Sequence, residues 1–484
     1  VKSGTDPEAI MNTPAGKPAS PELEEVTRLV LEAKEKAYEE TGHQAEPDLP
    51  HSVDWPVTCS VGPGLEGAIA CESKIGFVNG AKGWLIYRGY DIFDLCAYST
   101  FEETSYLLLH GSLPNAEELD AFKRTLHSRL HIPKTQRLLL SFPVEEMNPM
   151  AALRLGTNLM RQKQTTRDRQ GLDEMGAPIA SDEDSIPMET KPVGYRRPVF
   201  EFLSGVFGKR VSTDSPEEGL SSEEIESCYN LIAGVASIAA TIGRVRLGKL
   251  PLEPLPELSL AGNYLYMLTG REPTPLEERV MDICLILHAD HGMNASTFAA
   301  MVVASTLADI YLAIGSGISA LAGPLHGGAN IEVVKMLEEI NQYGAVSKWY
   351  RAALEEKRKV MGFGHRVYKA YDPRARILGP VAKLLASETQ DGRQLYETAV
   401  ALEHEVVSTL GEQKKIFPNV DFYSGLVYRS MDIPTDLYTT IFAVSRVSGW
   451  CARVVEYLQN NRIFRPRAIY TGTFNETYVP LGER

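Results

Sequence analysis

Apolar residues recur every three to four positions along most of this chain, which is the spacing of amphipathic or buried helices. The pattern predicts helices at about 116–130, 223–243, 275–288, 295–314, 330–339, 396–410 and 436–458. Between Gly64 and Tyr90 the texture changes to short β-type runs separated by turn residues, which predicts a small hairpin or meander. The sequence therefore predicts a mainly α fold with a small β element near the N-terminus.

Two stretches depart from this helical texture. Residues 1–55 form a predicted extension whose single helix starts at Ser20-Pro21, an N-cap followed by Pro at the first helical position. Residues from about 165 to 220 carry acidic and Pro runs and predict a long exposed insertion. By contrast, segment 231–243 is apolar on all sides, which predicts the middle of a large bundle or an oligomer interface. We favour a dimer whose interface is a helix sandwich.

Composition excludes several classes of partner. The chain has 484 residues, with 49 Lys and Arg against 63 Asp and Glu, a net charge of −14. Such a surface repels nucleic acids and anionic membranes, so an anionic small molecule would need a local cluster of cations. Six cysteines without CxxC spacing predict reduced thiols and a cytoplasmic location. Early acidic residues argue against a targeting segment, and segment 298–314 is interpreted as a helix buried in protein, not a membrane span.

Chemistry is most concentrated in the loop at 360–375. Gly362 and Gly364 leave the backbone free to adopt a positive φ or to approach a ligand, and His365 follows at once. An Asp-Pro-Arg turn ending at Arg374 predicts a helix start, where cations favour an anionic ligand. An ordinary basic surface loop with an incidental His explains this stretch equally well, so the rest of the chain has to decide.

Two other segments carry histidines. In 288–291 (His-Ala-Asp-His) a metal site lacks further ligands, and the pair can be satisfied by Asp290 or the backbone. We favour a third interpretation, in which His291 at a helix terminus binds an anionic ligand. In 322–330, Gly and Pro residues bracket His326, and a neutral His there can donate a hydrogen bond to a developing oxyanion or enol. The alternative is a tight helix–helix turn with an exposed His.

One carboxylate and several arginines complete the set. Asp421 lies between Val420 and Phe422, and a carboxylate desolvated by such neighbours is a better base than one in water. The alternative role for Asp421 is a helix N-cap. Arg446 lies on an apolar helix, where a charge is costly unless paired, and Arg465 follows the end of that helix. Converging arginines predict a di- or tricarboxylate ligand.

Together these residues match carbon–carbon bond formation at an activated carbonyl. A base removes a proton next to one carbonyl, one His stabilises the resulting enol, and another His polarises the acceptor carbonyl. The arginines hold the carboxylates of the acceptor.

At this point the motifs resemble those of the citrate synthase family. The run from Gly362 to Arg374 (Gly-Phe-Gly-His-Arg-Val-Tyr-Lys-Ala-Tyr-Asp-Pro-Arg) is similar to the family signature throughout. Three further motifs occur in the family's order: His-Ala-Asp-His at 288–291, Gly-Pro-Leu-His-Gly-Gly-Ala-Asn at 323–330 and Asn-Val-Asp-Phe at 419–422. The resemblance covers about 64–472, interrupted by the insertion.

The resemblance implies a role for each candidate residue. Asp421 would take a methyl proton from acetyl-CoA, His326 would hydrogen-bond the thioester carbonyl, and His365, helped by His291, would polarise the oxaloacetate ketone. Arg374 and Arg446 would bind oxaloacetate carboxylates. Arg465 would do so across a homodimer, from the other subunit. Charge and position alone suggest that CoA phosphates contact Lys359, Arg366 and Lys369.

The resemblance also implies the organisation of the protein and its partners. A large helical domain would comprise 56–327 and 433–484, and a small helical domain 328–432 would close on it. The partners would be oxaloacetate, acetyl-CoA and a second copy of the chain, with no metal or cofactor. Two alternatives stay open: a 2-methylcitrate synthase that uses propionyl-CoA, and a non-catalytic acyl-CoA-binding protein.

Overall fold

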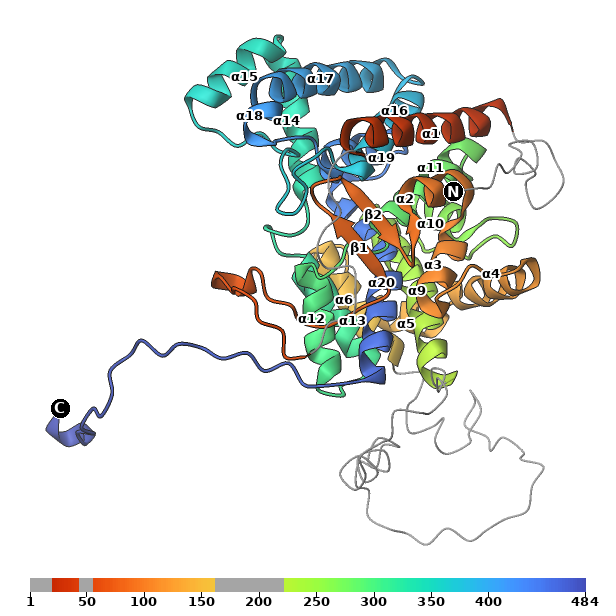
Figure 1. Ribbon diagram of the computed structural model, residues 1–484. Coiled ribbons are helices and arrows are strands. Elements are labelled where there is room, and N and C mark those ends of the chain that lie inside the picture. Colours follow the sequence, from red (N-terminus) through yellow and green to blue (C-terminus); the bar gives the residue numbers. More distant parts are fainter. Residues whose placement is uncertain (1–19, 43–54, 162–221) are drawn as a thin grey trace, which may run out of the picture.

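The fold is a large assembly of helices with one small sheet. A computed structural model describes residues 20–42, 55–161 and 222–484 (Figure 1), and the predicted insertion at about 165–220 lies outside these ranges. The helices are α1 Pro21–Thr41, α2 Ile92–Tyr98, α3 Phe101–His110, α4 Ala116–Leu130, α5 Pro133–Leu139, α6 Pro149–Met160, α9 Ser222–Arg246, α10 Leu260–Thr269, α11 Pro275–His288, α12 Ala295–Ser305, α13 Ile310–Leu321, α14 Ala329–Tyr343, α15 Val346–Glu355, α16 Pro373–Ala386, α17 Gln390–Val406, α18 Glu412–Lys414, α19 Val420–Ser430 and α20 Tyr438–Gln459. The prediction of a mainly α fold is confirmed.

The small β element is an antiparallel meander in the order β1-β2-β3. Its strands are β1 Gly76–Asn79, β2 Trp84–Tyr87 and β3 Tyr90–Asp91. Gly76 pairs with Tyr87 and Asn79 with Trp84, so β1 and β2 form a tight hairpin. The run at 64–70, also interpreted as β-type, is not a strand. It contains a short 3₁₀ turn, Pro63–Leu65, in which Gly64 has a φ of 70°.

One segment that was predicted as a single helix forms two helices. The segment 295–314 was expected to be continuous, but α12 ends at Ser305 and α13 starts at Ile310. Leu307 between them has a φ of 63°, which no helix can contain. Asp309 then caps α13, its carboxylate accepting the Leu312 N–H at 3.1 Å. The break creates a helical hairpin in which α12 and α13 pack on each other.

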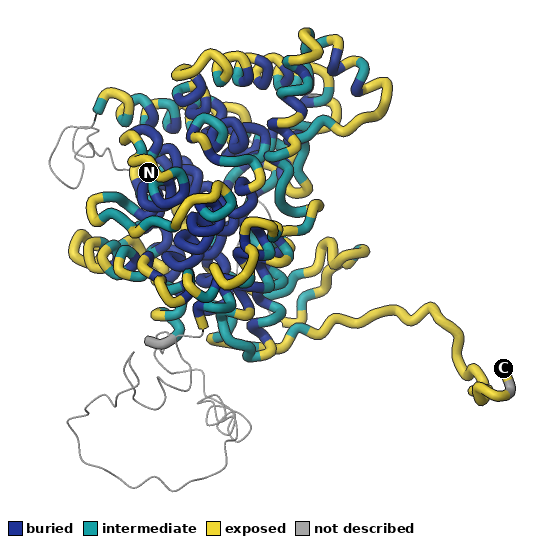
Figure 2. Tube along the Cα trace, turned by 180° about the vertical axis from the view of Figure 1, so that it is seen from behind, coloured by how far each residue is buried: buried dark blue, intermediate teal, exposed yellow. Residues whose placement is uncertain are grey.

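The core is built around α9 and α20. α9 packs against α4, α6, α10 and α20, and α20 also contacts α11, α12 and α13. The segment 231–243, predicted to be apolar on all sides, is buried along most of its length (Figure 2). By length and composition α9 could cross a membrane, but 72% of its apolar window is buried inside the protein, as for a central bundle helix.

Helices α14 to α19 form a second group. α16 packs against α17 and α19, and α14 packs against α15, α17 and α19. All of them lie within 328–432, the range predicted for the smaller domain. In Figure 1 this group lies above the central bundle.

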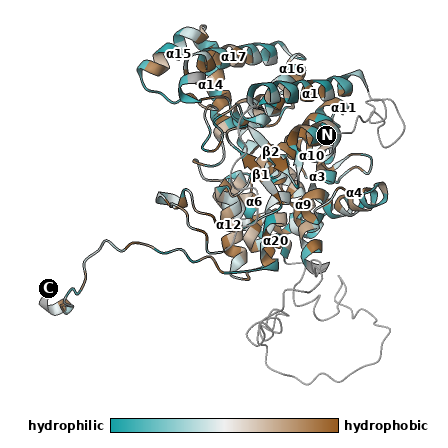
Figure 3. Ribbon diagram, viewed as in Figure 1, coloured by the Kyte–Doolittle hydropathy of each residue, from teal (hydrophilic) through white to brown (hydrophobic). Residues whose placement is uncertain are grey.

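α1, the helix of the N-terminal extension, spans this junction. It packs against α2 and α11 of the central bundle and against α16 of the second group. Val26, Val30, Ala33 and Ala37 form its buried stripe, while hydrophilic residues predominate on the rest of the helix (Figure 3). Ser20, predicted as the N-cap, makes no side-chain capping bond.

Candidate active site

The glycine-rich loop that precedes His365 is tied to the loop that precedes α19. Gly364 N–H donates to Phe417 O at 2.9 Å, and Asn419 N–H donates to Gly362 O at 2.9 Å. The Asn419 side chain also donates to Gly364 O at 2.9 Å. These bonds hold His365 next to the first turn of α19, where Asp421 lies.

Gly362 is required by both conformation and space. Its φ is 80°, which favours glycine. A Cβ at this position would lie 2.8 Å from the Phe422 ring and 2.8 Å from the Val333 side chain. The backbone therefore passes directly over α19, and this close approach brings the two loops together.

His365 is fixed as one tautomer. The backbone N–H groups of Val367 and Tyr368 donate to its Nδ1 at 3.0 and 3.1 Å. Because a backbone amide can only donate, Nδ1 is unprotonated and the proton of the neutral ring lies on Nε2. Burial lowers the pKa of His365 to about 4, so the ring is neutral at pH 7. His365 is therefore a neutral Nε2–H donor.

His291 lies beside His365, with ring centroids 5.3 Å apart. Its Nε2 is 3.2 Å from the Tyr368 hydroxyl. Burial, together with Arg374, holds the pKa of His291 well below its ordinary value. The favoured interpretation of this segment, in which His291 binds an anionic ligand, stays a prediction.

The other residues of the His-Ala-Asp-His segment have structural partners. His288 Nδ1 lies 2.7 Å from Cys284 O, so the backbone satisfies this nitrogen, while the buried Nε2 has no hydrogen-bond partner among the described residues. Asp290 binds Arg453 through both oxygens, at 3.1 and 2.7 Å, so it does not pair with the histidines. Among the described residues, no group of three His, Cys, Asp or Glu side chains is placed to hold a metal ion.

His326 is fixed as the opposite tautomer. It lies on the loop between α13 and α14, and the backbone N–H of Ser296, in the first turn of α12, donates to its Nε2 at 3.2 Å. The Ser296 hydroxyl lies 2.8 Å from the same nitrogen. The proton of the neutral ring is therefore on Nδ1. Burial and the nearby Arg446 lower the pKa of His326 to about 4. The ring is partly buried and bonded through Nε2, so it is not an exposed turn residue, and its Nδ1–H is left for a ligand.

Asp421 is not the cap of its helix. Asn419 caps α19, its side chain accepting the Asp421 N–H at 3.0 Å. Across the described ranges, no hydrogen bond to the Asp421 carboxylate is found. Burial raises the pKa of Asp421 to about 6, with Arg374 and Arg446 close enough to oppose that effect. The carboxylate therefore has the environment of a general base.

Arg374 is buried and already partly engaged. Its Nε and Nη2 donate to Asp372 at 3.0 and 2.8 Å. Asp372 also accepts the Val420 N–H at 3.2 Å, so it connects the first turns of α16 and α19. Because this edge of the guanidinium is occupied, Nη1 and the outer proton of Nη2 are left for the carboxylate that Arg374 was predicted to bind.

Arg446 has the stronger features of an anion site. It is 2% exposed on α20, and its Nε donates to His288 O. In the parts of the chain that the structure describes, no carboxylate forms an ion pair with it. Burial lowers the pKa of Arg446 to about 10, so it stays charged at pH 7. A buried cation without a counter-ion is costly, and a bound carboxylate would relieve that cost.

The remaining predicted cations are exposed. Lys359, Arg366 and Lys369 lie on the surface of the loop that carries His365, and Lys369 N–H ties this loop to Gly80 O at 2.8 Å. Arg465 lies on the exposed C-terminal tail, which extends away from the body (Figure 2). The structure therefore does not bring Arg465 to the cluster within its own chain.

Sequence reasoning missed the residues that orient this cluster. Tyr368, Asp372 and Asn419 were treated only as neighbours in their motifs, yet each bonds a predicted site residue or its loop. Only the Asp-Pro-Arg spacing carried a signal, as a helix start. The contacts themselves join segments up to 77 positions apart and cannot be identified locally.

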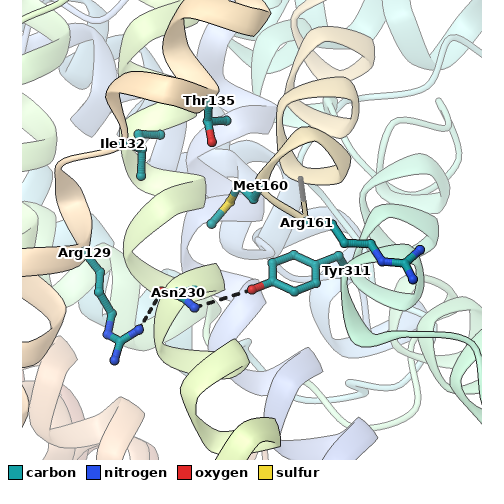
Figure 4. A pocket seen from close by; sticks show the side chains of 7 residues that line it. All are labelled: Arg129, Ile132, Thr135, Met160, Arg161, Asn230 and Tyr311. Atoms are coloured by element: carbon teal, nitrogen blue, oxygen red, sulfur yellow. Dashed lines mark hydrogen bonds between the residues drawn. The ribbon is translucent and has the colours of Figure 1, made fainter. Parts of the chain in front are cut away.

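A separate pocket lies elsewhere in the molecule. It is lined by Arg129, Ile132, Thr135, Met160, Arg161, Asn230 and Tyr311, on or next to α4, α5, α6, α9 and α13 (Figure 4). None of the predicted site residues lines it. Its arginines are paired, Arg129 with Glu226 and Arg161 with Asp309.

The cluster contains one base, two neutral donors and one unpaired buried cation. Asp421 can take a proton, and His326 and His365 can each donate a hydrogen bond to an oxygen without carrying charge. Arg446 and the free part of Arg374 can hold carboxylates. This arrangement suits enolisation of one substrate and activation of a carboxylate-bearing acceptor.

Comparison with known proteins gives consistent relationships. The family model described as citrate synthase, C-terminal domain, matches residues 64–467. The Bacillus subtilis protein "Citrate synthase 2" is 41% identical over 424 residues, which is 87% of this chain and 98% of that protein. The B. subtilis "Citrate/2-methylcitrate synthase" is 34% identical over 416 residues, 86% of this chain and 97% of that protein. A solved Thermoplasma acidophilum citrate synthase, in a ternary complex with carboxymethyl coenzyme A and oxaloacetate, superposes with a TM-score of 0.73 at 31% identity and covers 88% of this chain and 100% of that one.

Proposed function

This chain belongs to the citrate synthase family, and on that premise we propose that it condenses acetyl-CoA with oxaloacetate to give citrate and free CoA. The observation that carries the proposal is the combination around Asp421. A desolvated carboxylate with a pKa of about 6 lies near Arg374 and Arg446. The same arginines affect two histidines, each fixed as a neutral donor through a different ring nitrogen. Enolisation of a thioester and activation of a ketone need these two kinds of group.

In the first step, the Asp421 carboxylate removes a proton from the methyl group of acetyl-CoA. The Nδ1–H of His326 donates a hydrogen bond to the thioester oxygen as its charge grows. In the enol this proton lies on the oxygen, and it returns to His326 when the new carbon–carbon bond restores the carbonyl. Because Ser296 N–H holds Nε2 as an acceptor, the ring cannot turn over to the other tautomer without losing that bond.

In the second step, the enol carbon attacks the ketone carbon of oxaloacetate. The Nε2–H of His365 polarises the ketone oxygen, with His291 alongside. Arg446 and the free part of Arg374 bind the carboxylates, which fixes the face of the ketone that is attacked. Water then hydrolyses the citryl thioester in the same site, releasing citrate and CoA.

Three exposed cations extend this site toward the surface. Lys359, Arg366 and Lys369 contact the CoA phosphates, since they are exposed on the loop that carries His365. The support is their charge and position. No cofactor or metal takes part, because acid–base groups and arginines account for every step.

The site is completed by movement and by a second copy of the chain. The small domain 328–432 closes on the large domain formed by 56–327 and 433–484, which excludes water from the enol. In a homodimer, Arg465 of one subunit reaches oxaloacetate in the other. The extended, exposed tail supports this arrangement, because Ile469, Tyr470 and Phe474 on it are apolar and largely exposed in the single chain.

The free cysteines support a reducing compartment, the cytoplasm. All six cysteines are free, and four of them are buried. There the reaction is the entry step of the tricarboxylic acid cycle.

A second candidate is condensation with propionyl-CoA to give 2-methylcitrate. The similarity to a B. subtilis protein named for both activities favours keeping it. One extra methylene is worth only about 1–3 kcal/mol in a pocket, so both substrates can turn over. A non-catalytic acyl-CoA-binding protein is disfavoured, because it would have no use for an uncompensated base at Asp421.

Release of free thiol tests the proposal. Purified protein is mixed with oxaloacetate and either acetyl-CoA or propionyl-CoA, and kcat/KM is measured for each. A higher value for acetyl-CoA is expected. A preference for propionyl-CoA would transfer the assignment to 2-methylcitrate, and no thiol release with either substrate would refute an enzymatic role.

A further inference from the structure

Glu403 on α17 connects the two helices that carry Arg374 and Asp421. Its carboxylate accepts two tyrosine hydroxyls at once: Tyr371 Oη donates to Oε1 at 2.5 Å, and Tyr423 Oη donates to Oε2. The carboxylate is only partly exposed, and burial holds the pKa of both tyrosines well above the ordinary value, so both hydroxyls are protonated donors.

The two tyrosines lie at the starts of the two helices, one before α16 and one within α19. Tyr371 immediately precedes the cap of α16 and is three residues before Arg374. Tyr423 is in the first turns of α19, two residues after Asp421. A single side chain on α17 is therefore bonded to both segments that present the site residues.

Packing fixes the tyrosine rings as well as their hydroxyls. An ideal Cβ at Gly379 of α16 would lie 3.1 Å from Tyr423 Cε2, so the ring rests directly on the α16 backbone. On the other ring, the Arg376 guanidinium lies 4.5 Å from the Tyr371 centroid. With both rings held, a shift of Glu403 is transmitted to both helix starts.

We propose that Glu403 is a positioning residue that sets the distance between Asp421 and the oxaloacetate held by Arg374. The assignment rests on the proposed function for the roles of those two residues. Asp372 already joins the two helix starts close to the site, through Arg374 and the Val420 N–H. Glu403 supplies a second attachment on the far side. Two attachments fix the tilt of α19 relative to α16, which a single attachment leaves free. The tilt matters because a misplacement of about 1 Å can cost ~100-fold in rate.

The test is Glu403→Gln, which keeps the shape of the side chain. The amide offers one acceptor oxygen and presents an NH₂ group to the other tyrosine. That hydroxyl would have to turn round and accept, which leaves its own proton without the carboxylate acceptor. We expect kcat/KM for oxaloacetate to fall about tenfold or more, with the melting temperature lowered only slightly.

Two single variants divide the effect. Tyr371→Phe releases the start of α16 and is expected mainly to raise KM for oxaloacetate. Tyr423→Phe releases α19 and is expected mainly to lower kcat. A general loss of packing would not divide between KM and kcat in this way, so the division separates positioning from stability.

The same helix supplies matched controls. Glu405 of α17 accepts the Ser347 hydroxyl through one oxygen, so Glu405→Gln makes the same loss of charge on the same helix while its amide oxygen can keep the bond. The Tyr396 ring lies tilted against that of Tyr423, with centroids 6.3 Å apart and no hydrogen bond to Glu403, so Tyr396→Phe matches the tyrosine variants. Both controls are expected to keep wild-type kcat and KM.

The outcomes distinguish the two proposals. Wild-type kinetics in Glu403→Gln, or an equal loss in Glu405→Gln, would overturn the positioning role while leaving the proposed function intact. If the wild-type protein releases no thiol, the proposed function fails, and calorimetric binding of oxaloacetate then decides the inference. Affinity about tenfold weaker in Glu403→Gln would support it, and unchanged affinity would overturn it.

Discussion

Asp421→Asn should make the protein more stable and nearly inactive. Burial raises the pKa of Asp421 from 3.8 to about 6 in the folded protein. Between these two values the folded state binds more protons than the unfolded chain, so stability falls as the pH rises through this window. The difference of about 2 units corresponds to about 3 kcal/mol at 1.36 kcal/mol per unit. That free energy opposes folding in full above pH 6 and is absent below about pH 4.

Asparagine removes this charge while keeping the shape of the side chain. We therefore expect the free energy of unfolding to be up to about 3 kcal/mol higher at pH 8 for the variant, and the gain to vanish near pH 4. Removal of the base should lower kcat by ~10²–10⁴-fold, with oxaloacetate affinity retained. In the wild type, kcat/KM should fall about tenfold per pH unit below pH 6, since His326 and His365 are already neutral there.

The measurements are urea-denaturation midpoints from pH 4 to pH 8 and thiol release over the same range. Asp120→Asn, which changes an exposed carboxylate on α4, is the matched control and should shift neither. A variant no more stable than the wild type at pH 8 would contradict a desolvated Asp421. A stability gain that persists unchanged at pH 4 would show that charge is not its cause.

Three further substitutions test separate parts of the site. Arg446→Met should raise KM for oxaloacetate ~10–100-fold, since charge-assisted hydrogen bonds are worth about 1.5–3 kcal/mol, while thermal unfolding shows no loss of stability because a buried unpaired charge is gone. Ser296→Ala should lower kcat about five- to tenfold at unchanged KM, because only the backbone amide then orients His326; an unchanged kcat would mean that the hydroxyl is idle. Gly362→Ala should destabilise the fold by about 1–3 kcal/mol in urea titrations and reduce activity, because its φ of 80° and the adjoining ring leave no room for a methyl group; wild-type stability would contradict this close approach.

Local signals in the sequence were enough for many helices. α4 and α11 have the predicted bounds because capping boxes at Asn115 and Thr274 mark their starts. The break between α12 and α13 was missed because it depends on a positive φ at Leu307, a residue whose type gives no warning. The β-type pattern at 64–70 gave a wrong prediction because a strand forms only where a second strand pairs with it.

In the site, residue identity was more predictable than contact. His326, His365 and Asp421 are recognisable from their motifs, and the structure brings them together with Arg374 and Arg446, whose charges affect their pKa values. The tautomers were not predictable, because backbone amides brought in by folding determine them. The partial occupation of Arg374 by Asp372 was missed for a different reason. An Asp two residues before an Arg at a helix start can cap, pair or do both, and only the packed rotamers decide.

α1 also has a consequence for the order in which the chain assembles. Glu40 on this helix binds Arg376 on α16, 336 positions later in the sequence. α1 is synthesised early, whereas α16, its second partner, is synthesised only after most of the chain. The buried stripe of α1 consists of only two valines and two alanines. Before it docks, α1 therefore exposes little apolar surface that could cause aggregation. Docking of α1 is therefore expected to be a late folding event, and the junction that it spans should be the last part of the molecule to become resistant to a protease.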